Sequence, residues 1–257
     1  MPVALTIAGS DPSGGAGLQA DLKTFHRFGV YGEAVVTLIT VQNTRGVTRV
    51  DSLAADLVVQ QIGAVLSDIP PAAAKTGALG SKEVVAAVAA AAATFHFPLV
   101  VDPVMISKHG ARLLDDDSAR VLVEQLLPHA FLLTPNLDEA AAITGLMVND
   151  RVSMIRAAEK LIALGAANVL VKGGHLAGDA LDILLTASGE IHEFTAVRIA
   201  TPHTHGSGCT YSAAITAELA KGAGLVDAVR IAKDFVTRAI QKNPRLGGGQ
   251  GPLNHHA

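Results

Sequence analysis

The chain carries the segment Thr204-His205-Gly206-Ser207-Gly208-Cys209-Thr210, and a helix-type run over residues 211–221 follows it directly. Two glycines alternate there with small polar residues, so several backbone N–H groups can point toward one spot in front of a helix N-terminus. Such a spot binds anions, and a phosphoryl group in transfer would fit it. Cys209 is expected on the first turn of the helix, where a thiolate is stabilised. Taken alone, the segment is equally consistent with a plain glycine-rich turn.

Apolar, strand-like runs alternate with helix-like runs along the rest of the chain. Strands are predicted at residues 3–8, 34–41, 72–75, 99–101, 131–133 and 169–171, and helices at residues 18–28, 57–67, 81–95, 118–127, 153–164, 210–221 and 226–242. Continuous apolar strands between helices are typical of a parallel sheet covered on both faces. Residues 183–186 and 191–194, separated by Ser188-Gly189, predict a hairpin and hence an antiparallel edge. We expect one α/β domain over residues 1–257, a three-layer sandwich with a mostly parallel sheet.

Length and composition limit the classes of partner. With 257 residues, a net charge of −3 and no run of Lys or Arg, the chain is not expected to bind nucleic acid. The single cysteine, Cys209, excludes an internal disulfide framework and indicates a reducing compartment. The first residues lack a basic stretch, and the Ala-rich run at residues 84–93 is too short to span a bilayer. These features predict a soluble, cytoplasmic protein without a membrane partner.

Two nucleotide-binding motifs can be excluded. Gly15-Ala16-Gly17-Leu18-Gln19-Ala20 formally fits a dinucleotide fingerprint, which requires an acidic residue at the end of the second strand. The second predicted strand runs instead into Gln42-Asn43-Thr44, and the sequence contains no Walker A motif.

The histidines of the sequence, among them His203 and His205, also lack the spacing of a tetrahedral zinc site.

Polar residues follow the predicted strands, where the ligands of open parallel sheets bind. These strand ends carry Gly9, Gln42, Lys75-Thr76-Gly77, Asp102, Thr134-Pro135-Asn136 and Lys172-Gly173-Gly174. Each has an ordinary structural explanation by itself, since Asp102 can cap a turn and Lys172 and Glu139 can be solvated charges. Together they describe one cleft with a carboxylate pair (Asp102 and Glu139), a cation and an anion hole. That combination suits metal-assisted phosphoryl transfer.

Longer motifs surround these positions. They include Leu5-Thr6-Ile7-Ala8-Gly9-Ser10-Asp11-Pro12-Ser13-Gly14-Gly15-Ala16-Gly17, Gln19-Ala20-Asp21-Leu22-Lys23-Thr24-Phe25, Gln42-Asn43-Thr44-Arg45-Gly46-Val47, Asp102-Pro103-Val104-Met105 and Gly251-Pro252-Leu253-Asn254-His255. In these motifs and in the cysteine-bearing segment, the chain closely resembles the hydroxymethylpyrimidine/phosphomethylpyrimidine kinases of thiamine biosynthesis, a family of the ribokinase-like superfamily. The likeness runs nearly end to end. It implies a ribokinase-like α/β/α sandwich and a homodimer.

The resemblance also implies roles for individual residues. The aminopyrimidine would lie beside a group of residues near the first motif: Gly9, Ala16, Asp21 and Gln42. Mg²⁺ and the phosphates of ATP would be held by Asp102 and Glu139, with Lys172 and Asn136 on the nucleotide side. The catalytic anion hole would consist of Gly206, Ser207, Gly208 and Cys209.

The implied reaction moves the γ-phosphoryl group of ATP to the hydroxymethyl oxygen of the pyrimidine, and a second group to the resulting monophosphate. Many sugar kinases of this superfamily have an aspartate where this chain has Cys209. A thiol with an ordinary pKa of about 8.5, lowered at a helix N-terminus, could act as a base near neutral pH. Only the first step needs a base, because a monophosphate oxygen is already anionic. We therefore predict that Cys209→Ala slows the first phosphorylation far more than the second.

Other functions stay open at this point. Pyridoxal kinases phosphorylate a hydroxymethyl group on a related ring, and some proteins similar to this family accept both substrates. Gln42 favours an aminopyrimidine edge. The chain departs from the pattern of the family that it resembles at two positions. Ala78 stands where a larger apolar residue can line the pyrimidine pocket, and Ser207 stands where threonine is commoner. A ligand-sensing module without catalysis is a third possibility, against which the presence of every catalytic residue type argues. The polar segment Ser107-Lys108-His109-Gly110 is a candidate mobile flap.

Overall fold

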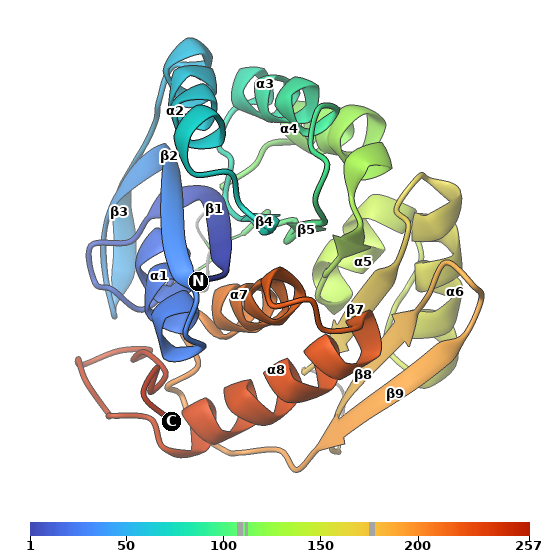
Figure 1. Cartoon of the computed structure of the whole chain (residues 1–257). Coiled ribbons are helices and arrows are strands. Elements are labelled where there is room, and N and C mark those ends of the chain that lie inside the picture. The colour runs from blue at the N-terminus through green and yellow to red at the C-terminus, as the bar shows by residue number, and fades with distance from the viewer. Residues whose placement is uncertain (107–109, 111–112, 175–177) are drawn as a thin grey trace.

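The computed structural model describes residues 1–106, 110, 113–174 and 178–257, and these contain a nine-stranded sheet. The strand order is β3-β2-β1-β4-β5-β6-β7-β8-β9 (Figure 1). The strands are β1 (Val3–Ser10), β2 (Tyr31–Asn43), β3 (Gly46–Ser52), β4 (Ala73–Thr76), β5 (Leu99–Val101), β6 (Leu132–Leu133), β7 (Val169–Gly173), β8 (Ala180–Leu185) and β9 (Ile191–Ala196). The α-helices are α1 (Gly17–Arg27), α2 (Ala55–Asp68), α3 (Lys82–Ala92), α4 (Asp116–Val121), α5 (Leu137–Thr144), α6 (Arg151–Ala163), α7 (Ser207–Ala220) and α8 (Leu225–Gln241).

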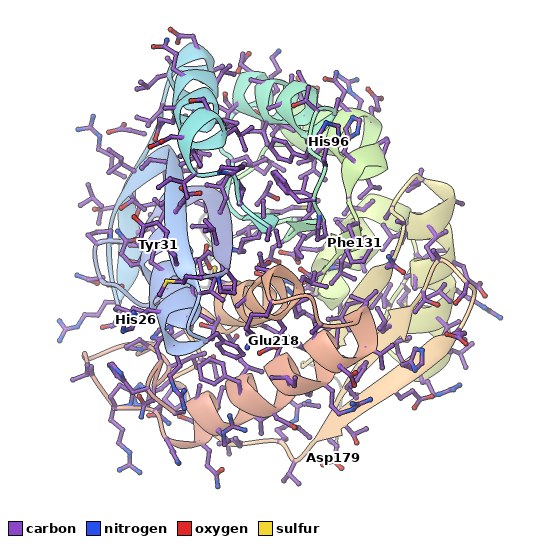
Figure 2. All side chains as sticks on the ribbon, in the orientation of Figure 1. His26, Tyr31, His96, Phe131, Asp179 and Glu218 are labelled. Atoms are coloured by element: carbon purple, nitrogen blue, oxygen red, sulfur yellow. The ribbon has the colours of Figure 1, made fainter. Side chains whose placement is uncertain are left out.

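Helices cover both faces of the sheet, because the apolar side chains of its central strands alternate between two cores. In β5, Leu99 and Val101 belong to the core shared with α2, α3, α5 and α6, whereas Val100 belongs to the core shared with α1, α7 and α8. Figure 1 shows these two helical layers on opposite sides, and the side chains in Figure 2 fill the space between the layers. The strands from β2 through β1, β4, β5 and β6 to β7 pair in parallel. The predicted three-layer, mostly parallel α/β fold is confirmed.

Both edges of the sheet are antiparallel. β7, β8 and β9 form the edge that the hairpin signal predicts. At the other edge β3 pairs antiparallel with β2, and the sequence pattern does not predict this strand. The residues of β3 are partly or fully exposed, so the strand lacks the apolar run of a buried one. Asn43 shapes the turn between the two strands, since its Oδ1 accepts the backbone N–H of Arg45 at 2.8 Å.

Three helices depart from their predicted bounds by three residues or more, and one of them is α3, which ends at Ala92 instead of residue 95. The helix predicted at residues 118–127 divides into α4, a π-helical turn over Leu122–Leu126 and a 3₁₀ turn over Leu127–His129. Asp115 caps α4, because its carboxylate accepts the backbone N–H of Ser118 at 2.8 Å. α7 begins three residues earlier than predicted, at Ser207. Among the described residues, no helix has both the length and the apolar character needed to cross a membrane.

Candidate active site

The carboxyl ends of the parallel strands open into a cavity of about 600 Å³. The predicted site residues that line it are Gly9, Ala16, Gln42, Asp102, Asn136, Glu139, Lys172, Gly206, Ser207, Gly208 and Cys209. Asp21 was assigned to the same site, but it is fully buried and does not belong to the lining that the described residues form. Of the candidate flap, Ser107, Lys108 and His109 lie outside the described residues. The structure thus gathers the predicted residues at the sheet edge where the topology places a ligand.

One wall of the cavity is the N-terminus of α7 with the residues before it, here named the anion-hole segment (residues 204–210). Gly206 takes a φ of 81° directly before the helix, and the backbone N–H of Ser207 donates to the carbonyl oxygen of Thr204 at 3.2 Å. The next N–H groups, those of Gly208 and Cys209, belong to the first helical turn, where no intrahelical acceptor exists. With the positive end of the helix dipole behind them, they favour an anion in the cavity.

A largely buried ion pair lies against this turn. Lys172 Nζ is 2.9 Å from Asp102 Oδ1, and Ser212 Oγ donates to Asp102 Oδ2 at 3.2 Å. A Cβ atom on Gly208 would lie 3.4 Å from Lys172 Nζ, an ordinary van der Waals distance, so the first turn of α7 lies directly beside the pair. Burial alone would lower the pKa of Lys172, but Asp102 and Glu139 raise it above its ordinary value. The cavity therefore contains a fixed cation beside the anion hole.

Glu139 lies on the first turn of α5 and forms a capping box with Asn136. Asn136 Oδ1 accepts the N–H of Glu139 at 2.9 Å, and Glu139 Oε2 accepts the N–H of Asn136 at 2.8 Å. Burial raises the pKa of Glu139 to about 7; Lys172 opposes this shift and Asp102 adds to it. Asn136 and Glu139, which the sequence predicts to bind the nucleotide, therefore also stabilise the N-terminus of α5.

The carboxylates of Asp102 and Glu139 are close enough for their charges to interact. Within the described part of the chain, no group of three or more His, Cys, Asp or Glu side chains could hold a metal ion by itself. Mg²⁺ usually takes one or two carboxylates and completes its octahedron with phosphate oxygens and water. The donor set therefore fits a magnesium ion that arrives with nucleotide phosphates.

Cys209 is half-buried at the cavity surface. Burial raises the pKa of its thiol to about 12, although Lys75 and the backbone N–H of Gly17 act in the opposite direction. Asp21 and Asp102 raise the pKa further. The described residues therefore do not favour a thiolate near neutral pH, because burial and the two carboxylates raise the pKa of the thiol.

Asp21 serves a buried contact instead of the cavity surface. Its Oδ2 lies 2.8 Å from Lys75 Nζ and accepts a hydrogen bond from Thr6 Oγ1 at 2.7 Å. Lys75 and Asp21 have no exposed surface. The sequence pattern places Lys75 at a strand end and indicates no role for it. The available signal was a lysine within the short strand β4, directly after two alanines, because a buried lysine needs a partner.

The cavity continues beyond the predicted residues toward α8. Lys233 Nζ lies 2.7 Å from Asp182 Oδ2 and donates to the carbonyl oxygen of Ala180 at 2.9 Å. An apolar strip lines this part of the cavity: Val197, Ile199, Val236 and Ile240. Sequence reasoning missed all of these residues. Residues 197–199 belong to no regular element, and the charge of Lys233 on an amphipathic helix resembles an ordinary surface charge.

Comparison with known proteins identifies the family. A sequence model of the phosphomethylpyrimidine kinase family matches residues 11–254. The hydroxymethylpyrimidine/phosphomethylpyrimidine kinase of Synechococcus elongatus is 47% identical over 256 residues, which are 99% of this chain and 97% of that protein. The thiamine biosynthesis bifunctional protein ThiED of Geobacter sulfurreducens is 48% identical over 253 residues, which are 98% of this chain but only 51% of that protein, so the chain spans about half its length.

A solved structure agrees with this assignment. The ADP complex of Bacillus subtilis pyridoxal kinase superposes with a TM-score of 0.92 and 40% sequence identity, over 100% of this chain and 98% of that one. Identity at this level over the full length shows a shared fold and a common family origin. The chain belongs to the phosphomethylpyrimidine kinase family and has its ribokinase-like fold.

Proposed function

We propose that this protein transfers the γ-phosphoryl group of ATP to 4-amino-5-hydroxymethyl-2-methylpyrimidine and then a second one to the monophosphate, in thiamine biosynthesis. The observation that carries the proposal is the position of the α7 N-terminus. Gly206 packs against Gly15 of the loop at the pyrimidine side, and Gly208 packs against the Lys172–Asp102 pair at the nucleotide side. A phosphoryl group in front of this helix would face both substrates. The names of the full-length relatives support the same reaction.

In the first step the hydroxymethyl oxygen attacks the γ-phosphorus, the bond from phosphorus to the bridging oxygen breaks, and ADP leaves. The residues supply position and positive charge, which is most of what a loose phosphoryl-transfer transition state requires. Because the Cys209 thiol has a raised pKa of about 12, we assign it a positioning role. The proton of the alcohol then passes to an oxygen of the transferred phosphoryl group. In the second step a monophosphate oxygen attacks without losing a proton.

Asp102 and Glu139 are the residues that would hold Mg²⁺, since both line the cavity beside Lys172. A bound magnesium ion would neutralise charge on the phosphate oxygens. Lys172 contributes a permanent charge next to the first turn of α7. The apolar strip near α8 offers a surface for the flat base of the nucleotide.

Gln42 is the proposed contact for the pyrimidine edge. A carboxamide offers both a donor and an acceptor, which matches the amino group and the adjacent ring nitrogen of an aminopyrimidine. Gly9 and Ala16 would border the same ring, with Asp21 supporting them from the buried side through its bond to Lys75. We expect Gln42→Leu to lower kcat/KM for the pyrimidine more than for pyridoxal.

Pyridoxal kinase activity is the second candidate. The full-length likeness to the Bacillus subtilis pyridoxal kinase favours it, and Ala78 leaves room in the cavity lining for a differently substituted ring. The curated relatives of similar or higher identity are named as pyrimidine kinases, which favours the first reading.

A homodimer and a cytoplasmic location are part of the proposal, as is a single catalytic domain over residues 1–257. Ile39 and Val41, on β2 next to the edge strand β3, are about half exposed. Exposed apolar residues beside an unpaired strand edge support self-association. The cytoplasmic location rests on the single cysteine.

The decisive experiment measures ATP consumption with the pyrimidine, its monophosphate and pyridoxal in parallel, with products identified by mass. Turnover of the first two substrates to a diphosphate supports the proposal. Faster turnover of pyridoxal would assign the protein to vitamin B6 salvage, and no turnover would favour a sensing role. Lys172→Gln protein, purified identically, controls for contaminating kinases.

A further inference from the structure

Asp11 and His205 join two segments that lie far apart in the sequence. Asp11 belongs to the first loop (residues 9–17), and His205 belongs to the anion-hole segment. His205 Nε2 lies 2.8 Å from Asp11 Oδ2, and the two residues are 3% and 1% exposed. α1 and α7, which follow these two segments, lie side by side (Figure 1). No role was assigned to either residue by the sequence motifs or by the reaction described above.

Asp11 also organises its own loop. Its Oδ1 accepts the N–H of Ser13 at 2.8 Å, and its Oδ2 accepts the N–H groups of Gly15 at 3.2 Å and Ala16 at 2.8 Å. Ser13 Oγ donates to Oδ2 at 2.9 Å. Burial acts to raise the pKa of Asp11, but the bonds from His205 and Ser13 outweigh it and lower the pKa, so the carboxylate stays charged. The conformation around Ala16 therefore depends on this one carboxylate.

His205 is held from its other side by a later part of the chain. Its backbone N–H donates to the carbonyl oxygen of Gly251 at 3.2 Å. The imidazole itself fills the space beside Gly15, where an added Cβ would come within 2.6 Å of His205 Cδ2. An added Cβ on Gly206 would overlap the carbonyl oxygen of Gly15. The two segments are thus in direct contact, and the Asp11–His205 pair forms a buried polar bond across that contact.

We propose that Asp11 and His205 form a positioning pair, which fixes the anion-hole segment relative to the loop that borders the pyrimidine. This inference rests on the function proposed above. The pair acts through Ala16 on one side and through Gly206 to Cys209 on the other. It sets the separation between the accepting hydroxyl group and the amides that receive the phosphoryl group. Since a displacement of the reacting groups by about 1 Å can lower the rate about 10²-fold, loss of this bond should slow the reaction.

Substitutions on the two sides of the pair test the coupling. His205→Ala removes the bond, and His205→Gln restores a donor of similar reach. Asp11→Asn removes the charge but retains an oxygen for the loop amides. We expect His205→Ala to lower kcat about tenfold or more and to raise the KM for the pyrimidine, with an unchanged KM for ATP, and His205→Gln to recover most of the loss. Since Asp11→Asn weakens the same contact by removing its charge, the double variant Asp11→Asn/His205→Ala should lose little more than the worse single variant.

Hydrogen exchange of the free enzymes gives a readout that does not depend on the substrate. Asp11→Asn should speed amide exchange in residues 204–210, and His205→Ala should speed it in residues 9–17, while β7 to β9 stay as in the wild type. A matched control is His192→Ala, which removes another histidine–carboxylate contact, with Glu190 at 3.7 Å, from a residue that is not part of the cavity lining.

The outcomes separate the two proposals. Unchanged exchange across the pair, or kinetic losses that simply add in the double variant, would overturn the positioning role. A general loss of folding would show as faster exchange throughout and as a lower kcat without any change in KM, and that too would count against it. If the wild-type enzyme prefers pyridoxal, the proposed function fails, but the exchange data still decide whether the pair couples the two segments.

Discussion

Lys75 and Asp21 form an ion pair without any exposed surface, with Lys75 Nζ 2.8 Å from Asp21 Oδ2. The pair connects β4 to α1, and its charges act on the thiol of Cys209 from inside the protein. Burial raises the pKa of Asp21 despite the opposing effect of Lys75. Burial lowers the pKa of Lys75, but Asp21 and its neighbours raise it overall. The charged form of each side chain is therefore stabilised by the opposite charge of the other.

Breaking this pair should destabilise the protein strongly. Asp21→Asn would leave the Lys75 ammonium buried without a counter-charge, and we expect a loss of about 3–5 kcal/mol in the free energy of unfolding. Replacing both partners, as in Asp21→Leu/Lys75→Met, should cost less than that. Urea unfolding at neutral pH measures the difference. Glu193→Gln, which breaks the exposed pair with Arg151, should change stability by less than about 1 kcal/mol. Equal effects of the buried and exposed changes would contradict the expectation.

Cys209→Ala should slow the two phosphorylations by similar factors. The raised pKa of about 12 leaves the thiol protonated at neutral pH, so its removal perturbs positioning in both steps. This replaces the expectation from the sequence that the first phosphorylation slows far more than the second. Single-turnover rates with the pyrimidine and with its monophosphate check it, with Cys209→Ser as the conservative variant. A loss of about 10²–10⁴-fold confined to the first step would restore the base role.

The fold was predictable because the signals that determine it are local. The apolar runs of β1, β5 and β7 lie between amphipathic helices, and this alternation specifies a covered parallel sheet. The place of the site followed as well, since Asp102 and Lys172 stand directly at strand ends. The sequence does not predict β3, because this exposed edge strand has neither a long apolar run nor a regular alternation of apolar and polar residues.

The electrostatics of the site were not predictable in the same way. A helix N-terminus argues for a lowered pKa at Cys209, but the result depends on burial and on Asp21 and Asp102, which only the fold brings near. Likewise, Asp11 and His205 are separated by nearly two hundred residues, and nothing in either motif indicates that they bond. Long-range pairs of this kind follow from the packing of α1 against α7.

Gly206→Ala should abolish most activity, whereas Gly222→Ala should not. Both glycines have positive φ values, 81° and 86°, which cost an alanine about 1–2 kcal/mol. Only at Gly206 would the added Cβ also overlap a backbone atom, the carbonyl oxygen of Gly15. The comparison therefore separates the effect of backbone strain from that of a displaced anion hole. Thermal unfolding and kcat of the two variants measure it, and equal loss of activity in both would argue against a special role for this contact.

Ile39→Lys should weaken self-association. Ile39 is 49% exposed on β2, beside the open edge of β3, and a charge there would have to be buried in a dimer. Sedimentation velocity at several protein concentrations measures the change in molecular mass. Ile231→Lys, at a site 41% exposed on α8, introduces the same charge on another surface. If both variants and the wild type sediment alike, this edge is not the interface.

His255 should make the protein less stable in mild acid. Its side chain is buried, and its Nε2 lies 3.2 Å from Thr210 Oγ1 in the first part of α7. Burial, together with Lys23 and His256, lowers its pKa to about 4, whereas the unfolded value is near 6.5. Between about pH 6.5 and pH 4, His255 therefore binds a proton in the unfolded chain but not in the folded protein. The stability that His255 contributes is complete above pH 6.5 and decreases as the pH falls, by up to about 3 kcal/mol.

Replacing the histidine should remove this part of the pH dependence. We expect the unfolding free energy of His255→Gln to fall less steeply between neutral pH and pH 4.5 than that of the wild type, as measured by urea unfolding at each pH. Other groups titrate in the same range, so the difference between the two curves is the informative quantity. His26→Gln is the matched control, because His26 is exposed on the last turn of α1 (Figure 2). Parallel curves for all three proteins would mean that His255 is protonated in the folded state as readily as in the unfolded chain.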